Sequence, residues 1–228
     1  MIKTVLAPVH REGWIFITLG LALTIILCFV HSLLACGGLL ITLWMAYFFR
    51  NPCRITPIRE GLIVSPADGI VQSITEAAPP AELGIYEGMW TRISIFLNVF
   101  DVHIQRIPIT GVITKAVYHP GKFFNASLDK ASEHNERQSL LITTTKGLKI
   151  PVVQIAGLIA RRIRCDVKEE QSVLAGESYG LIRFGSRVDI YLPGGLAPLV
   201  IEGQRMTGGE TIIADILNKE PRRQGECR

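Results

Sequence analysis

The chain lacks several patterns that would assign a function directly. Its 228 residues contain no glycine-rich loop of the phosphate- or dinucleotide-binding type, and no cluster of His, Cys, Asp or Glu at metal-ligand spacing. The five cysteines have neither metal-ligand nor redox spacing, which favours reduced thiols in a cytoplasmic protein over a disulfide framework. The net charge of +4 comes without a dense Lys/Arg run. The sequence therefore does not indicate nucleic acid, and a weakly basic face is more compatible with anionic lipid.

The longest stretch without a charged residue predicts a membrane segment. No Asp, Glu, Lys or Arg occurs between Gly13 and Phe49. One span needs ~20 apolar residues, so this run is too long for one span and slightly short for two. His31-Ser32 and Cys36-Gly37-Gly38 interrupt it near the middle. We therefore expect a hairpin of two short helices, over 14–30 and 33–49.

The flanking residues predict how this hairpin is oriented. Trp14, Trp44 and Tyr47 lie towards its outer ends, where interfacial aromatic residues belong. Lys and Arg flank both ends and are absent from the middle, so both ends are expected on the cytoplasmic side of the cell membrane. A cleaved signal peptide fits poorly, because its apolar core is shorter. A helical hairpin buried in a soluble core is the structural alternative. Whether the hairpin spans the bilayer or re-enters it stays open.

The chain after residue 50 reads as many short strands. Apolar, β-prone runs occur at 61–64, 70–75, 90–99, 111–119, 138–145, 148–156, 158–167, 179–184 and 187–192. This spacing, without alternation of strands and helices, predicts a mainly β, antiparallel sandwich or barrel-sandwich-like domain. The expected layout is an N-terminal segment (1–12), a hairpin (13–49), a β-rich catalytic domain (50–218) and a polar, disordered tail (219–228).

The stretch around Gly185-Ser186 stands out among these runs. Val188, Ile190 and Leu192 alternate with polar or aromatic residues, which predicts a half-buried strand. Gly-Ser separates this strand from the preceding run, 179–184. The ordinary interpretation is a bulge on an edge strand. The same arrangement also suits a reaction in which the Ser186 oxygen attacks the carbonyl of Gly185.

Other polar residues are candidates for chemistry, although each has an ordinary explanation alone. Asp68 precedes Gly69 and could be a turn former. His103, in an apolar stretch, could be a structural imidazole. His119 and His134 belong to a polar loop that begins near Pro120 and runs to about 137, where surface polarity would explain them. Long loops in compact domains are nevertheless often functional.

Taken together and in order, these segments resemble one family. The chain is similar to the short, membrane-associated phosphatidylserine decarboxylases from the hairpin to about residue 217. The resemblance rests on Tyr47-Phe-Phe-Arg-Asn-Pro52, Ser65-Pro-Ala-Asp-Gly69, Asn98-Val-Phe-Asp-Val-His103, Tyr118-His-Pro-Gly121, Val153-Gln-Ile-Ala-Gly157 and Arg183-Phe-Gly-Ser-Arg-Val-Asp189.

The resemblance implies self-cleavage. Ser186 attacks the Gly185 carbonyl to form an ester, and β-elimination then expels the Gly185 carboxylate. The dehydroalanine that remains hydrolyses to a pyruvoyl group. The enzyme would then be a heterodimer of its own fragments, 1–185 and 186–228, and a higher homo-oligomer stays open. The pyruvoyl ketone, which condenses with the serine amine of the phospholipid, serves as the electron sink, so neither a metal nor an external cofactor is needed.

The resemblance also suggests roles for other residues. An Asp and a His assist in the family, and by position these are Asp68 and His103. The longer bacterial pattern reads Asp-x-His-x-x-His, but this chain has Arg106 at the second histidine. Arg cannot act as a general base, so His103 serves both steps, or His119 or His134 contributes. Arg106 could pair with the substrate phosphate or carboxylate.

Three alternatives stay open. The substrate could be a related serine phospholipid of the archaetidylserine type, which differs away from the reacting head group. The chain could instead be a membrane-anchored serine hydrolase with Ser186, His103 and Asp68 as a triad, although it lacks a Gly-x-Ser-x-Gly elbow. Finally, turns such as Ala175-Gly-Glu are similar to those of non-enzymatic barrel-sandwich carrier or adaptor domains, in which Ser186 would be structural.

Overall fold

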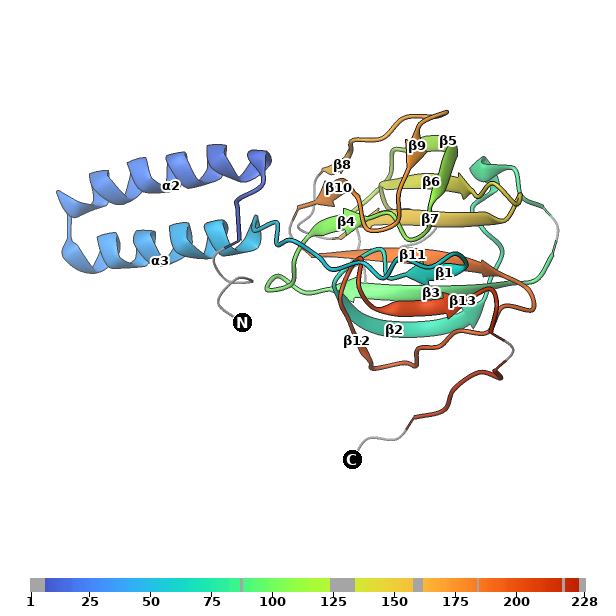
Figure 1. Cartoon of the computed structure of the whole chain (residues 1–228). Helices are drawn as coiled ribbons and strands as arrows, with labels where there is room; N and C mark the ends of the chain where they lie inside the picture. Colours follow the sequence, from blue (N-terminus) through green and yellow to red (C-terminus); the bar gives the residue numbers. More distant parts are fainter. Residues whose placement is uncertain are drawn as a thin grey trace. The chain divides into compact units, whose positions relative to one another are not determined.

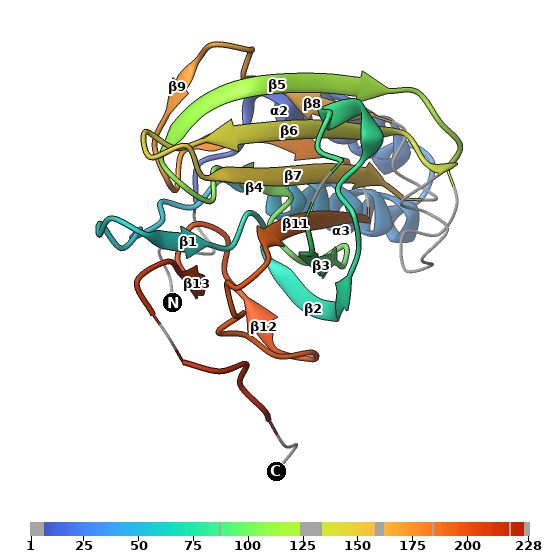
Figure 2. The same ribbon diagram turned by 90° about the vertical axis from the view of Figure 1, so that its right-hand side faces the viewer.

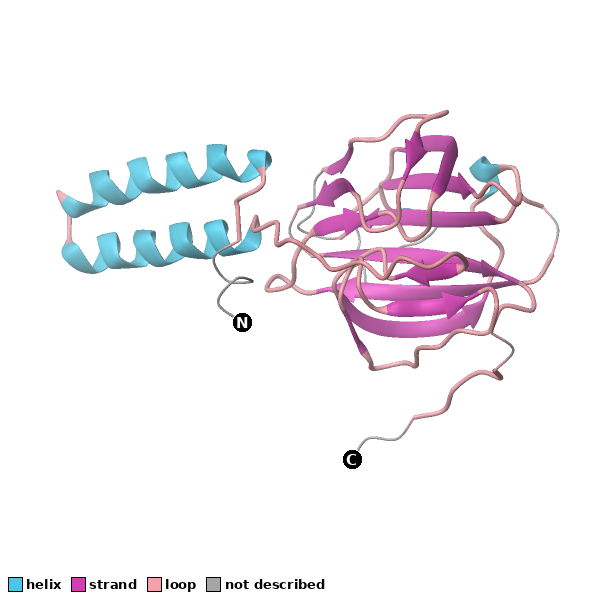
Figure 3. Ribbon diagram, in the orientation of Figure 1, coloured by secondary structure: helices cyan, strands magenta, loops and turns pink. Residues whose placement is uncertain are grey.

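The computed structural model describes residues 7–86, 88–123, 134–157, 162–183, 185–218 and 220–225 (Figure 1). The chain divides into two compact units, Met1–Cys53 and Arg54–Arg228. The first unit is helical, and the second consists mainly of antiparallel strands (Figure 3). The predicted fold class, a helix pair followed by a mainly β domain, is therefore confirmed.

The first unit is a pair of helices joined by three residues. Helix α2 spans Arg11–Cys28 and α3 spans Ser32–Phe48. The ring nitrogen Nδ1 of His10 accepts a hydrogen bond from the Glu12 amide at 3.3 Å, and His31 caps α3 in the same way. These N-terminal caps satisfy backbone N–H groups that have no partner within the helix. His31 therefore starts the second helix, in the middle of the apolar run.

Two glycine–threonine contacts hold the helices together. Gly20 lies against Thr42, and Gly38 lies against Thr24, so closely that a Cβ on either glycine would come within 2.6 or 2.9 Å of the threonine Oγ1. Each threonine hydroxyl donates to the carbonyl four residues earlier in its own helix, at 2.8 Å. Both hydroxyls are thus satisfied inside an interface of small residues, which is a packing mode suited to helices in lipid.

The second unit is built from short strands. They are β1 (Leu62–Val64), β2 (Gly69–Glu76), β3 (Trp90–Leu97), β4 (Ile104–Arg106), β5 (Gly111–His119), β6 (Arg137–Thr143), β7 (Lys149–Ala156), β8 (Ile163–Cys165), β9 (Ser172–Val173), β10 (Ser178–Ile182), β11 (Ser186–Pro193), β12 (Arg205–Met206) and β13 (Ile212–Asp215). A short 3₁₀ helix, η1, spans Ala81–Leu83.

The strands form three sheets. The largest has the order β12-β2-β3-β11-β7-β6-β5-β9, and the others have the orders β4-β10-β8 and β1-β13. Figure 2 shows the largest sheet curving, with β11 between β3 and β7. One core cluster unites apolar residues of all three sheets, such as Val188, Tyr179 and Ile213. The curved sheet therefore wraps around a shared apolar interior.

Strand β11 has two distinct faces. Ser186 lies opposite Leu97 of β3 and Ala156 of β7, and directly paired residues point to the same side of a sheet. We call the side that bears Ser186 and Val188 the inner face, because Val188, Leu97 and Ala156 all belong to the main core. The opposite side, which bears Arg187, Asp189 and Tyr191, is the outer face.

The structure contradicts both the predicted half-burial of this strand and the ordinary interpretation of Gly185-Ser186 as part of an edge strand. Every residue from Ser186 to Leu192 is buried, so the strand is not half-buried, and it is central rather than an edge strand. The reason lies on the outer face. There, Tyr191 packs with Trp90, Val153 and Ile155, and Arg187 forms an ion pair with Asp189. A polar residue in an alternating pattern was therefore a poor indicator of solvent.

Other strand limits also differ from the predictions. Strands β4, β9, β12 and β13, of two to four residues, are too short for their alternation to be recognised in the sequence. Within the expected strand over 158–167, the structure forms only β8, and residues 158–161 lie outside those described. Residues 124–133 of the predicted polar loop, and 219 and 226–228 of the predicted tail, also lie outside the described residues.

Candidate functional site

Gly185 and Ser186 lie where the chain leaves one sheet and enters another. Strand β10 belongs to the three-stranded sheet, whereas Ser186 is the first residue of β11 in the largest sheet. Gly185 makes this crossing with φ +74°, a conformation that side-chain-bearing residues adopt at a cost. Ser186 is fully buried, and its hydroxyl has no hydrogen-bond partner among the described residues. An unpartnered buried hydroxyl beside a glycine carbonyl is free to react with it.

The His103 side chain hydrogen-bonds to the backbone of Gly185. Its Nε2 accepts a hydrogen bond from the Gly185 amide at 3.3 Å, and its Nδ1 lies 3.0 Å from the Asp101 carbonyl oxygen. A carbonyl can only accept, so Nδ1 carries the proton and Nε2 has the lone pair. The buried imidazole therefore presents a basic nitrogen to the Gly185-Ser186 segment.

Asp101 positions this imidazole, a role that sequence reasoning did not assign. It is buried, and one carboxylate oxygen accepts from the Asn98 amide at 2.9 Å while the other is paired with Arg205. These contacts fix the turn whose carbonyl receives the His103 proton. The signal was present in the sequence as the Asp-x-His spacing, but nothing in that spacing shows that the backbone carbonyl is the contacting group.

The structure places Asp68 in separate contacts. Its carboxylate accepts from Arg54 at 2.6 Å and from the Gly208 amide at 2.8 Å. Burial raises the pKa of Asp68 above its ordinary value; Arg54 and the Gly208 amide oppose this rise, and the charge of Asp101 adds to it. The contacts of the Asp68 carboxylate are thus with Arg54 and Gly208, whereas His103 contacts the backbone carbonyl of Asp101.

The remaining predicted residues differ in their surroundings. Arg106, on β4, is buried and donates to the Gly176 carbonyl at 2.8 Å. His119 is the exposed last residue of β5, rather than part of the following loop. His134 is also exposed, but it lies next to a segment that contacts the site, because the Asn135 side chain donates to the Ala156 carbonyl at 2.8 Å and Ala156 faces Ser186.

The strand pairing shows how the two sides of the Gly185–Ser186 bond are held. After the bond come β11, β12 and β13, and each pairs with strands that precede it: β11 with β3 and β7, β12 with β2, and β13 with β1. A break at this bond would leave the C-terminal piece hydrogen-bonded into the sheets. Separation of the pieces would require the core to open.

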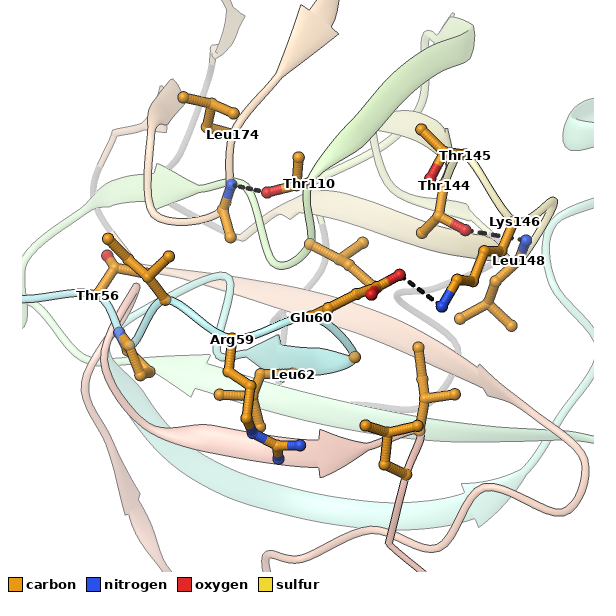
Figure 4. A pocket seen from close by; sticks show the side chains of 17 residues that line it. Thr56, Arg59, Glu60, Leu62, Thr110, Thr144, Thr145, Lys146, Leu148 and Leu174 are labelled. Carbon is orange, nitrogen blue, oxygen red and sulfur yellow. Dashed lines mark hydrogen bonds and ion pairs between the residues drawn. The ribbon is translucent and has the colours of Figure 1, made fainter.

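A large cavity lies elsewhere in the β unit. It has a volume of about 540 Å³, and Ile109, Leu174 and Leu217 are among the apolar residues that line it (Figure 4). The turn Thr144–Lys146 also lines it, at the end of β7 opposite Ala156. None of the predicted site residues is part of its lining. The described residues contain no group of three His, Cys, Asp or Glu side chains that could hold a metal ion.

Comparisons with known proteins show the family of the chain. The family model described as phosphatidylserine decarboxylase matches residues 41–214. A phosphatidylserine decarboxylase proenzyme of Cereibacter sphaeroides is 55% identical over 228 residues, covering 100% of this chain and 98% of that protein. The proenzyme of Rickettsia bellii is 57% identical over 212 residues (93% and 92%), and that of Paramagnetospirillum magneticum is 52% identical over 221 residues (97% and 92%).

Proposed function

The chain belongs to the phosphatidylserine decarboxylase family and is a carboxy-lyase, and from this premise we propose that it activates itself by cleavage between Gly185 and Ser186. The mature enzyme then decarboxylates phosphatidylserine to phosphatidylethanolamine and CO₂. The observation that carries the proposal is the buried, unpartnered Ser186 hydroxyl beside a glycine carbonyl, with a basic imidazole nitrogen at the same segment. The word proenzyme in the relatives' names is consistent with such processing.

The cleavage balances without an oxidant or a metal. Ser186 Oγ attacks the Gly185 carbonyl carbon, the amide C–N bond breaks, and an ester with a free Ser186 amine results. Loss of the Ser186 α-proton then expels the Gly185 carboxylate, which becomes the new C-terminus of fragment 1–185. Water converts the remaining dehydroalanine to a pyruvoyl group and releases ammonia. The new fragment 186–228 stays in place through its three paired strands.

His103 is the proposed base for the first step. In the precursor, its Nε2 accepts a hydrogen bond from the Gly185 N–H. In the first step, Nε2 accepts instead from the neighbouring Ser186 O–H and takes that proton as the oxygen attacks. The Asp101 carbonyl, which accepts from Nδ1–H, stabilises the positive charge that the ring then gains. Asp68 is assigned an assisting role, and its raised pKa suits a carboxyl that holds a proton more readily than an exposed one.

The surroundings of Ser186 fit a group made from this residue. When formed, the pyruvoyl carbonyl supplies an electron sink for the pair left by departing CO₂. The chain's own contribution is a dry setting, because Ser186, His103 and Val188 are all fully buried. Excluding water protects the carbanion left by CO₂ from protonation by solvent, so that this carbon receives its proton from the protein.

The helical unit is proposed to anchor the enzyme in the cytoplasmic membrane. Helix α2 is long and apolar enough to cross a membrane by length and composition, although core helices and signal sequences meet the same criterion, and α3 is a shorter apolar helix. Support comes from the two glycine–threonine contacts and from large apolar side chains exposed along both helices, such as Leu19 and Leu40. At 1.5 Å per residue, 18 residues extend about 27 Å, close to the ~30 Å hydrocarbon thickness.

Intact mass tests the proposal directly. Purified wild-type protein should consist of two fragments, 1–185 and 186–228, and the smaller one should have a blocked N-terminus that reacts with a hydrazine. The Ser186→Ala variant should remain one chain of 25.2 kDa and release no CO₂ from phosphatidylserine. An uncut wild-type chain that decarboxylates normally would overturn the proposal.

A further inference from the structure

Two buried glutamines next to Ser186 have polar atoms left over. Gln154 Nε2 donates to Gln105 Oε1 at 2.9 Å, and both residues are fully buried. Among the described residues, Gln105 Nε2 and Gln154 Oε1 have no hydrogen-bond partner. Leaving such groups unpaired in a core is energetically unfavourable. A buried polar pair with two unsatisfied atoms destabilises a core more than an apolar pair does. A ligand that hydrogen-bonds to both atoms would remove this destabilisation.

The strand register places this pair at the reacting serine. Gln154 is directly opposite Val188, so it is on the inner face and one diagonal step from Ser186. Diagonal neighbours on adjacent strands have Cα atoms about 7–8 Å apart, within reach of a long side chain. Gln105 follows His103 by two residues on the sheet that faces β7 across the core. The glutamine pair thus joins the largest sheet, which contains Ser186, to the three-stranded sheet, whose strand β4 begins directly after His103.

The free atoms have complementary chemistry. Gln154 Nε2 also points to the Arg164 carbonyl at 3.5 Å, and because a carbonyl only accepts, the amide orientation of Gln154 is defined. Gln105 therefore offers an N–H donor, and Gln154 offers a carbonyl acceptor. The serine head group carries a carboxylate, which accepts hydrogen bonds, beside an amine, which donates them. One amide pair can satisfy both groups.

A neutral donor is also the better choice for this reaction. A Lys or Arg on the carboxylate would stabilise the charge that decarboxylation removes, and would lower the energy of the bound substrate more than that of the transition state. An amide N–H orients the carboxylate with a weaker hold on its charge. We propose that Gln105 and Gln154 form the head-group recognition site, with Gln105 Nε2 binding the serine carboxylate and Gln154 Oε1 binding the amine. This inference rests on the proposed function, because it places the substrate at Ser186.

Substrate and product separate the two roles, since phosphatidylethanolamine keeps the amine and lacks the carboxylate. Gln105→Met keeps the length of the side chain and removes its donor. We expect it to raise the KM for phosphatidylserine in mixed micelles by about 10- to 100-fold, with an unchanged inhibition constant for phosphatidylethanolamine. Gln154→Met should weaken the binding of both lipids by a similar factor of about ten.

Cleavage into two fragments, measured by intact mass, reports folding and maturation independently in each variant. Ser94→Ala is the matched control, since Ser94 is also fully buried with an unpartnered hydroxyl but lies opposite Asp189 on the outer face. It should change neither the KM for phosphatidylserine nor the inhibition constant for phosphatidylethanolamine. An unchanged KM in Gln105→Met, or equal factors for both lipids in that variant, would overturn the carboxylate assignment. Failure of the proposed function would instead appear in the wild type, as an uncut or inactive chain.

Discussion

The two faces of the largest sheet differ in the charged groups that they bury. On the outer face, Arg187 Nε lies 2.8 Å from Asp189 Oδ1, and Arg137 Nε lies 2.7 Å from Glu82 Oε1, so charges close on one another. On the inner face, Ser186 Oγ has no partner among the described residues, although it lies on the same strand. Ion pairs hold the outer face, whereas the unpartnered Ser186 hydroxyl adjoins the Gly185 carbonyl on the inner face.

His103→Ala removes the imidazole that contacts the Gly185 amide and has the largest expected effect. Removal of a general base typically slows a reaction by about 10²- to 10⁴-fold, so freshly made precursor should remain uncut over that longer time. The measurement is a time course of fragment formation by mass, with circular dichroism to confirm folding. His119→Ala, at the exposed end of β5, is the control and should mature normally. Normal maturation of His103→Ala would place the base elsewhere.

Asp189→Ala tests the outer face. It removes the carboxylate that pairs with the buried Arg187 guanidinium, and breaking a buried ion pair from one side typically costs about 3–5 kcal/mol in the free energy of unfolding. Urea unfolding in the uncut Ser186→Ala background avoids any effect of cleavage. A double variant, Arg187→Met with Asp189→Leu, removes both charges and should recover most of the loss. Equal destabilisation by the single and double variants would mean that the ion pair is not the cause.

The pH dependence of stability tests the second outer-face ion pair, between Glu82 and Arg137. Burial raises the pKa of Glu82, but hydrogen bonds from Arg137 and Ser139 outweigh this and lower it from 4.5 to about 2. Because the folded pKa is depressed, this pair stabilises the fold above about pH 4.5 and progressively less as pH falls towards 2. Glu82→Gln should therefore be destabilising at pH 7 and nearly neutral near pH 2, measured by unfolding at both. A loss that is independent of pH would contradict this.

Gly185→Ala should have the smallest effect. Its positive φ costs a side-chain-bearing residue about 1 kcal/mol, and a Cβ there meets nothing within 4 Å among the described atoms. In the Ser186→Ala background, the free energy of unfolding should fall by about that amount. A loss as large as that of Asp189→Ala would indicate that the Gly185 conformation supports far more of the core than its contacts suggest.

Much of the molecule could be predicted from local patterns. The helix pair follows from an uncharged run, and the long strands β3, β5 and β7 follow from apolar alternation, because both signals are contained within one segment. The shortest strands could not be predicted, since two or three residues carry no period. The burial of both faces of β11 was missed for a related reason. Alternation shows which residues differ in polarity, but not that Asp189 will neutralise Arg187 two residues away.

An apolar hairpin, a mainly β unit and a Gly185-Ser186 pair within a family-specific order of motifs can all be inferred from the sequence. Which groups meet at that pair depends on the fold. It brings His103 to the Gly185 amide, directs Asp68 to Arg54 and Gly208, and sets Gln154 beside Ser186. Hydrogen bonds and strand register join residues up to 156 positions apart, and no local pattern records such pairings.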